Sequence, residues 1–395
     1  MLVRAPLLGL VTTGDAMGTL ARVLQAGIRP VEMRLLGVEF GVTVGHGFGR
    51  HRFGGLPGKG ETLQCTGTPR VPDARTLSKM FSIGLVLSAG GPLGDPWHSG
   101  VLGRLQETTG WDARSADLVI GTSAGSITAL TIRAGVAAVD RKLHMTGGPI
   151  SPEAEEIYAR IVTPYSEPEI GRNWRPASPK MALRAAWPPW NLDPARLAMA
   201  NLPRGNRSGE PLEKRMNELL PEGWPEQPTW IIAVRMFDGR RVVFGRDDVR
   251  GTVGQAVRSS SAVPGYYTPG RVGDREYIDG GVHSSTNLDL AAMLGFDLVI
   301  VSSAMTAAEG SRSWVSDPTR SWFSNKLDHE VAEVRARGTA VVVIEPDHLT
   351  IDALDKTADN ARANATNAGA AAVDRVLSGV NGAGLTELIE RAAAD

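Results

Sequence analysis

The pentapeptide GTSAG at residues 121–125 holds the first side chain whose type and setting could do chemistry. Ser123 lies between two glycines in a G-x-S-x-G pattern, which follows a predicted strand at residues 117–120 and opens an alanine-rich stretch that reaches about residue 137. This order predicts a strand, a sharp turn and a helix, an arrangement that presents a serine hydroxyl as a nucleophile. In a chain with 46 glycines the pattern alone is weak. The alternative is an ordinary glycine-rich turn.

A second glycine-rich segment, AGGPLG at residues 89–94, directly follows an earlier apolar run at residues 81–87. Glycines let backbone N–H groups approach a ligand oxygen closely, so the segment could bind a phosphate or stabilise an oxyanion. No Gly-Lys-Ser/Thr ending is present and Ala89 occupies the first position of the loop, which argues against a nucleotide site. Because a serine nucleophile is predicted on the next strand, we interpret the segment as an oxyanion hole.

An aspartate ends a third strand-like segment, YIDGG at residues 277–281. Its carboxylate would lie at the carboxyl edge of the sheet, where we also expect Ser123. Asp279 can act as a general base only within hydrogen-bond reach of the hydroxyl and partly removed from water, because the pKa of a free aspartate is near 4. Asp-Gly on its own usually marks a hairpin turn, so this interpretation depends on the other two segments.

A Ser-His-Asp triad of the α/β-hydrolase type is the main rival. Its order would be Ser123, an acid, and then His329 or His348, and His348 follows a predicted strand at residues 340–344. The triad would leave Asp279 and its two glycines unexplained.

Two further histidines, His98 and His283, lie near the motifs in the sequence, and we interpret both as polar residues at the rim of the site. No spacing of His, Cys and acidic residues resembles a zinc site. We therefore expect neither a metal nor another cofactor. The single cysteine, Cys65, excludes an intrachain disulfide framework.

Together and in this order, the three motifs resemble those of the patatin-like phospholipases of the bacterial type. The matching residues are the nucleophile Ser123, the base Asp279, the oxyanion-binding residues Gly90, Gly91, Gly94 and Ala124, and the motif glycines Gly121, Gly125, Gly280 and Gly281. Residues 256–265 (AVRSSSAVPG) resemble the stretch that usually leads into the aspartate, and Asn287 and Asp289 resemble polar positions that often follow it. The similarity covers about residues 81–303 well and the tail loosely.

The resemblance implies a serine acyl-hydrolase that cleaves lipid or fatty-acyl esters through an acyl-enzyme, using a Ser–Asp dyad. Phospholipase A, lysophospholipase, esterase and thioesterase activities all stay open. The chain departs from the family at Ala89, where a glycine is usual, and at Leu93, where many members carry Lys or Arg. Without the basic side chain, this position offers no positive charge to a phosphate or an oxyanion. A lipid-binding protein of this fold without catalytic activity is therefore a further alternative.

Composition narrows the class of protein. Charged residues make up 22% and apolar residues 42% of the 395 residues, which is typical of globular proteins. The formal net charge of −1 gives no indication of a nucleic-acid partner. We predict a cytoplasmic protein whose partner is its lipid or acyl-ester substrate. For Trp187 and Trp190 we favour packing of the cap described below onto the sheet, and peripheral contact with a membrane is the alternative role of these side chains.

The elements that must position these residues follow a βαβ order. We predict an α/β fold with a mostly parallel central sheet and helices on both faces, with the site at the carboxyl edge of the strands. Residues 1–79 are predicted to be a low-order N-terminal extension, and residues 80–395 the acyl-hydrolase domain. A Pro- and Trp-rich segment at about 150–226 breaks the alternation and is predicted to be a helical cap-like insertion.

Overall fold

The computed structural model describes residues 81–164, 205–354, 358–379 and 382–394. Within these residues eight strands form one sheet in the order β5-β6-β3-β2-β1-β7-β8, with β4 paired to β3. The strands are β1 (Ile83–Leu87), β2 (Leu118–Thr122), β3 (Thr229–Arg235), β4 (Arg241–Phe244), β5 (Gly270–Val272), β6 (Arg275–Asp279), β7 (Leu298–Ser302) and β8 (Ala340–Ile344). The α-helices are α2 (Gly94–Thr109), α3 (Ala124–Arg133), α4 (Ala138–Thr146), α5 (Pro152–Ala159), α8 (Glu210–Leu219), α9 (Val253–Ser260), α10 (Pro318–Arg335), α11 (Ala361–Ser378) and α12 (Gly382–Ala394).

The centre of the sheet is parallel. Strand β1 pairs in parallel with β2 and β7, β2 pairs in parallel with β3, and β7 with β8. Strands β1, β2 and β7 are buried along their whole length, as continuous apolar runs covered on both faces should be. The prediction of a mostly parallel sheet is confirmed, and the antiparallel strands β4, β5 and β6 lie at the β3 end.

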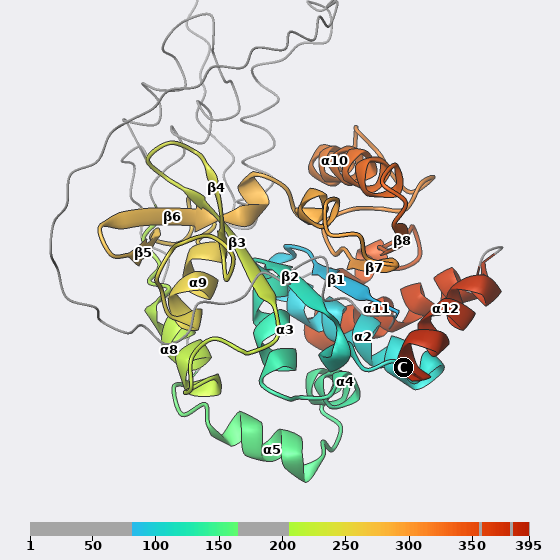
Figure 1. Cartoon of the computed structure of the whole chain (residues 1–395), viewed down its shortest axis with the longest axis horizontal. Helices are drawn as coiled ribbons and strands as arrows, with labels where there is room; N and C mark the ends of the chain where they lie inside the picture. The colour runs from blue at the N-terminus through green and yellow to red at the C-terminus, as the bar shows by residue number, and fades with distance from the viewer. Residues whose placement is uncertain (1–80, 165–204, 355–357, 380–381, 395) are drawn as a thin grey trace, which may run out of the picture.

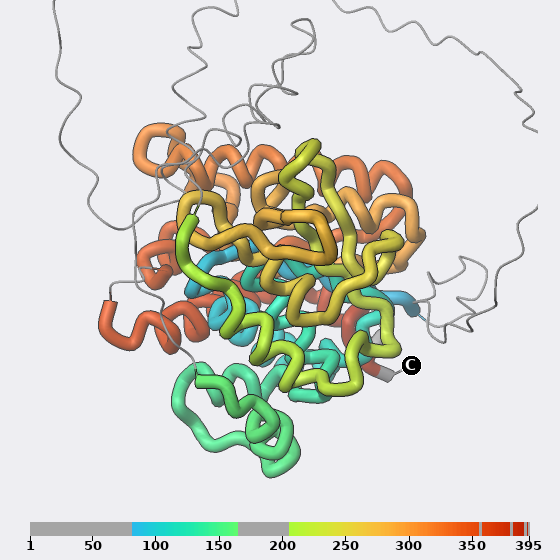
Figure 2. Tube along the Cα trace, turned by 90° about the vertical axis from the view of Figure 1, so that its left-hand side faces the viewer, coloured from blue at the N-terminus to red at the C-terminus, as the bar shows by residue number. Residues whose placement is uncertain are grey.

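Helices cover both faces of the sheet, as predicted (Figure 1). On one face Leu85 and Ile300 of the strands pack with residues of α2, α3, α11 and α12. On the other face Val86 and Val299 pack with Leu327 and Val334 of α10. In both views α10 and α5 lie at opposite ends of the described structure (Figure 2).

Three of the described helices are not predicted by the apolar pattern: α4, α9 and α10. Helix α10 buries few large apolar side chains over its 18 residues, so its helical period is weak in the sequence. Helix α9 is short and rich in small residues, and it begins with a capping box in which Thr252 and Gln255 bind each other's backbone N–H groups. Capping and tertiary packing specify α9 and α10 more than periodicity does.

The predicted cap-like insertion lies partly outside the described residues. Its described helices α5 and α8 pack onto the apolar cluster that includes β3 and α9, and Trp224 donates its Nε1–H to the Gly251 carbonyl at 2.8 Å. Trp187, Trp190 and the extension at residues 1–79 lie outside the described residues, so the cap, the extension and the membrane contact stay predictions. Among the described helices, none combines the length and apolar character needed to cross a membrane.

Candidate active site

Ser123 occupies the turn between β2 and α3 with a backbone conformation that L-residues rarely adopt. Its φ is 53° and its ψ is −117°. The flanking glycines make this turn sterically possible: a Cβ on Gly121 would lie 2.7 Å from the Gly125 carbonyl oxygen, and one on Gly125 would lie 2.2 Å from the Leu87 carbonyl oxygen. Backbone strain of this kind costs about 1–3 kcal/mol and clusters at functional sites. The turn therefore has the strand–turn–helix geometry predicted from the pentapeptide.

The sheet itself brings Asp279 to Ser123. One edge of β3 is occupied by β4 over residues 231–234. Strand β2 pairs with β3 as far as Thr122 opposite Ile232, and β6 pairs with the next residue, so that Asp279 lies opposite Ala233. Since β4 holds the other edge at both positions, β2 and β6 share one edge of β3 and meet end to end. The residue after β2 is Ser123 and the last residue of β6 is Asp279, so the two side chains come from the two sides of this junction.

The two side chains interact with each other. Hydrogen bonding with the Ser123 hydroxyl lowers the pKa of Asp279, and the Gly281 N–H donates to Asp279 Oδ1 at 2.7 Å. Both side chains are nearly buried, with exposed fractions of 4% for Ser123 and 5% for Asp279. Burial raises the pKa of Asp279 to about 7, against the lowering effect of these two hydrogen bonds. The carboxylate can therefore accept a proton near neutral pH, which a solvated aspartate does poorly.

The glycine-rich loop lies against the start of α3. A Cβ on Gly90 would lie 2.3 Å from Gly94 Cα, and one on Gly94 would lie 2.7 Å from Ala124 Cβ. The first residues of α2 and α3 are thus in contact, which places two helix N-termini, each with partial positive charge, beside Ser123. Leu93 is buried within this loop, with 6% of its surface exposed.

Three backbone N–H groups around this contact make no hydrogen bond within the described part of the chain. They belong to Gly90, Gly91 and Ala124. The Gly94 N–H is different, because it donates to the Gly91 carbonyl. The geometry thus gives Gly94 the role of allowing close helix contact, while the three free N–H groups are the ones that could bind an oxyanion.

The prediction that His98 is a rim residue is wrong. His98 is completely buried in α2, with Nε2 2.9 Å from the Ser88 carbonyl oxygen and Nδ1 2.7 Å from Ser302 Oγ. Because a carbonyl only accepts, Nε2 carries the proton and Nδ1 accepts from the Ser302 hydroxyl. Burial lowers the pKa of His98 to about 4. The Ser88 carbonyl also accepts the Gly125 N–H at 3.1 Å, so the neutral imidazole braces the junction of β1, α2 and α3. His283 is exposed, and its place at the rim of the site stays a prediction.

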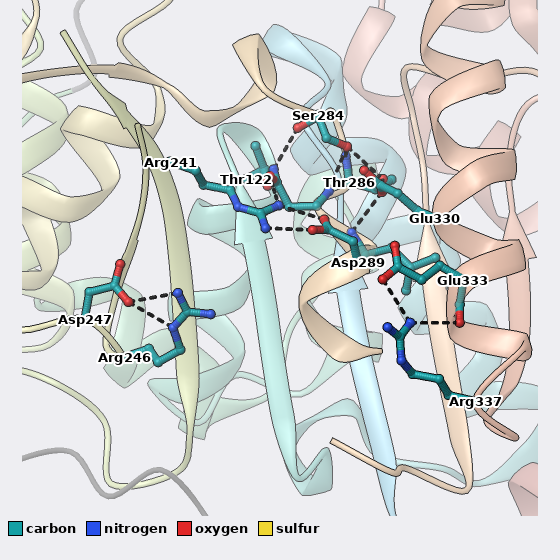
Figure 3. A network of polar contacts seen from close by, with 12 residues as sticks. Thr122, Arg241, Arg246, Asp247, Ser284, Thr286, Asp289, Glu330, Glu333 and Arg337 are labelled. Carbon is teal, nitrogen blue, oxygen red and sulfur yellow. Dashed lines mark hydrogen bonds and ion pairs between the residues drawn. The ribbon is translucent and has the colours of Figure 1, made fainter. Parts of the chain in front are cut away.

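A polar network anchors the loop that follows Asp279 (Figure 3). Asn287, which has a left-handed φ of 54°, donates from Nδ2 to Thr122 Oγ1 at 3.1 Å and to the Ser284 carbonyl at 2.7 Å. Arg241 donates to Asn287 Oδ1 at 3.2 Å and forms two hydrogen bonds of 2.7 and 2.6 Å with the Asp289 carboxylate. The positions matched by resemblance at Asn287 and Asp289 therefore tie this loop to the residue before Ser123.

A second anchor of this loop, Glu330 of α10, was not predicted from the sequence. The carboxylate of Glu330 accepts the Thr286 hydroxyl at 2.6 Å and the Leu288 N–H at 3.0 Å. Its burial raises its pKa. Only the three-dimensional packing of α10 on the sheet brings this residue to the loop.

The histidines of the rival triad are on the surface. His329 of α10 and His348, which follows β8, are both exposed, whereas Ser123 and Asp279 are buried and interact with each other. In the described residues no cluster of three or more His, Cys, Asp or Glu side chains could hold a metal ion.

The chain was compared with known proteins. A comparison with curated protein sequences found no match. The model of the family described as "Patatin-like phospholipase" matches residues 85–292, which run from β1 through the Ser123 turn, β6 and the loop after Asp279. Because this match covers more than half of the chain, the protein belongs to the patatin-like phospholipase family.

Proposed function

We propose that the protein hydrolyses fatty-acyl esters of lipids through an acyl-enzyme, with Ser123 as the nucleophile and Asp279 as the general base. Membership of the patatin-like phospholipase family implies lipid acyl-hydrolase activity. The observation that supports the finer assignment is the interaction of the Ser123 hydroxyl with a buried carboxylate whose pKa is about 7. When the pKa of a general base lies near the working pH, much of the base is ionised and it still accepts a proton readily.

In the proposed first step, the Asp279 carboxylate takes the Ser123 hydroxyl proton while Oγ bonds to the acyl carbon. The carbonyl oxygen becomes an oxyanion, which accepts hydrogen bonds from the N–H groups of Gly90, Gly91 and Ala124. The tetrahedral intermediate then expels the alcohol, which leaves with the proton from Asp279. This gives the acyl-enzyme on Ser123.

In the second step, Asp279 takes a proton from water as the water oxygen attacks the acyl carbon. Collapse of the second oxyanion breaks the bond to Ser123 Oγ, which regains its proton from Asp279, and the fatty acid is released. One carboxylate thus acts as base and acid in turn, so the cycle needs neither an imidazole nor a metal ion.

Leu93 bears on the substrate class. A buried leucine stands where many family members carry a basic side chain, so this position offers no cation to a phosphate. We therefore expect uncharged esters to be cleaved at least as well as phospholipids of equal acyl length.

The test is p-nitrophenyl ester hydrolysis across acyl-chain lengths by the wild type, Ser123→Ala, Asp279→Asn and His348→Ala. Both dyad variants should lose activity and His348→Ala should keep it. If Asp279→Asn stays active while His348→Ala does not, a triad replaces the dyad. A fluorophosphonate probe provides an independent readout, because a catalytically silent lipid-binding protein would leave Ser123 unlabelled.

A further inference from the structure

Helix α9 ends beside the candidate dyad, and the residues at its end bind the backbone of both members. Ser260, the last residue of α9, accepts the Ser123 N–H at its Oγ at 2.8 Å. Two residues later, the Ala262 carbonyl accepts the Asp279 N–H at 3.1 Å. A three-residue segment thus contacts the nucleophile on one side and the base on the other.

The Ser123 N–H needs this partner because of where it lies. The ladder between β2 and β3 ends at Thr122, so Ser123 has no strand partner, and its left-handed φ removes it from the regular backbone pattern. Ser260 is completely buried, and water is therefore kept away from its hydroxyl. Without Ser260 Oγ, the buried Ser123 N–H would have no hydrogen-bond partner. The free-energy cost of an unsatisfied N–H would favour a different backbone conformation of this strained turn.

The contact also determines which N–H groups can stabilise an oxyanion. With its N–H bound to Ser260, Ser123 itself cannot donate to a substrate oxygen. The free N–H groups of Gly90, Gly91 and Ala124 remain for that purpose. The end of α9 thus turns the nucleophile's own N–H away from the substrate while it fixes the orientation of the turn.

We propose that Ser260 is a positioning residue for the reaction, which acts by holding the Ser123 turn in place beside Asp279. Segment 260–262 accepts hydrogen bonds from the backbone on both sides of the junction between β2 and β6. It thereby sets the distance between Ser123 and Asp279. This inference rests on the proposed Ser–Asp mechanism.

The chain offers a matched control in the neighbouring residue. Ser259 is on the same helix and is equally buried, but its hydroxyl has no hydrogen-bond partner among the described residues. Ser259→Ala and Ser260→Ala remove the same atom from the same helix end, and only the second removes a contact to Ser123. A difference between them therefore measures the contact rather than the loss of a buried hydroxyl.

The experiment measures kcat, KM and the pH dependence of kcat/KM for p-nitrophenyl ester hydrolysis. Ser260→Ala should lower kcat about 10- to 100-fold, since small misplacements of reacting groups have effects of this size, with little change in KM. The Ser123 hydrogen bond lowers the pKa of Asp279, so loosening it should also move the ascending limb of the pH profile to higher pH. Ser259→Ala should stay within about two-fold of the wild type and leave the limb in place.

Equal kinetics for the two variants, or a fall in activity without a shift of the limb, would overturn the inference. If Ser260→Ala does not fold, Ser260→Cys keeps the shape of the side chain with a weaker acceptor, and it should give an intermediate kcat and an intermediate shift. A Ser260→Cys variant with wild-type kinetics would count against the proposal. An inactive wild type that no fluorophosphonate labels would instead refute the underlying mechanism, so the two failures are distinguishable.

Discussion

Replacing Asp279 by Asn should strongly lower activity and at the same time stabilise the folded protein. The pKa of this carboxyl is about 7 in the folded chain, against an ordinary value of 3.8, and burial is the main cause. One pKa unit corresponds to about 1.4 kcal/mol, so the buried carboxylate destabilises the folded state by up to about 4 kcal/mol when it is ionised. Asparagine cannot ionise, and its amide can still bond to Ser123 and to the Gly281 N–H.

The sign of the effect depends on pH in a defined way. A carboxyl whose pKa is raised by folding holds its proton in the folded chain over a range in which the unfolded chain has released it. The cost is therefore absent below about pH 3.8, grows as the pH rises, and is complete above about pH 7. The free energy of unfolding of Asp279→Asn minus that of the wild type should thus be much larger at pH 8 than at pH 4.5.

Urea unfolding followed by circular dichroism at the two pH values measures this difference. Asp238→Asn is the matched control, because the hydrogen bond from Arg235 is the main cause that lowers the pKa of Asp238. That variant should lose stability relative to the wild type at pH 8, the opposite sign. Ester hydrolysis by Asp279→Asn should fall about 10²–10⁴-fold. If the difference in free energy of unfolding between Asp279→Asn and the wild type is the same at pH 4.5 and pH 8, ionisation of Asp279 does not destabilise the fold. That result would refute the raised pKa assigned to this carboxyl.

Three further predictions concern the same site. In the wild type, kcat/KM should rise with pH along a limb with an apparent pKa of about 7, because the proposed base Asp279 would have to be ionised; a flat profile between pH 5.5 and 8.5 would contradict this. His98, with its pKa lowered to about 4 from 6.5, stabilises the fold above pH 6.5 and loses up to about 3 kcal/mol of that contribution as the pH falls to 4. Urea unfolding should therefore show a smaller loss over this range for His98→Gln than for the wild type, and equal losses would exclude His98 as the cause. Gly94→Ala, whose Cβ would lie 2.7 Å from Ala124 Cβ, should separate the two helix starts and lower kcat about 10²-fold, and unchanged kinetics would show that this contact is not needed.

Most of the central sheet could be predicted because its strands are short, continuous apolar runs. Residues 83–87 and 298–302 are buried on both faces, and this burial imposes the composition that the sequence displays. Helix α10 escaped prediction for the converse reason, since its contact with the sheet depends on a few side chains such as Phe323 and Leu327. A wide apolar stripe is visible in a sequence, but a narrow contact is not.

The candidate site was predictable where backbone conformation restricts residue type. The close packing around the Ser123 turn leaves no room for a side chain at Gly121 or Gly125. The two glycines in the pentapeptide therefore predict the turn. His98 and Ser260 were misjudged or missed because nothing local restricts them. A buried histidine bonded to Ser302, 204 positions away, has the same sequence signature as an exposed one.

The end-to-end meeting of β2 and β6 explains why the site could not be assembled from the motifs alone. The serine and aspartate motifs each end a strand, and a fully parallel sheet would place both at one edge without specifying that they touch. Contact arises because β6 runs antiparallel to β3 and occupies the positions that β2 leaves free, Ala233 to Arg235. The carboxyl ends of β2 and β6 then face each other along one edge of β3, with Ser123 and Asp279 at the two ends. The end of α9 and the residues after it accept hydrogen bonds from both Ser123 and Asp279. The distance between these two residues therefore depends on a third element, which carries no catalytic motif. Variants that alter this segment should therefore change the chemistry more than the binding of substrate.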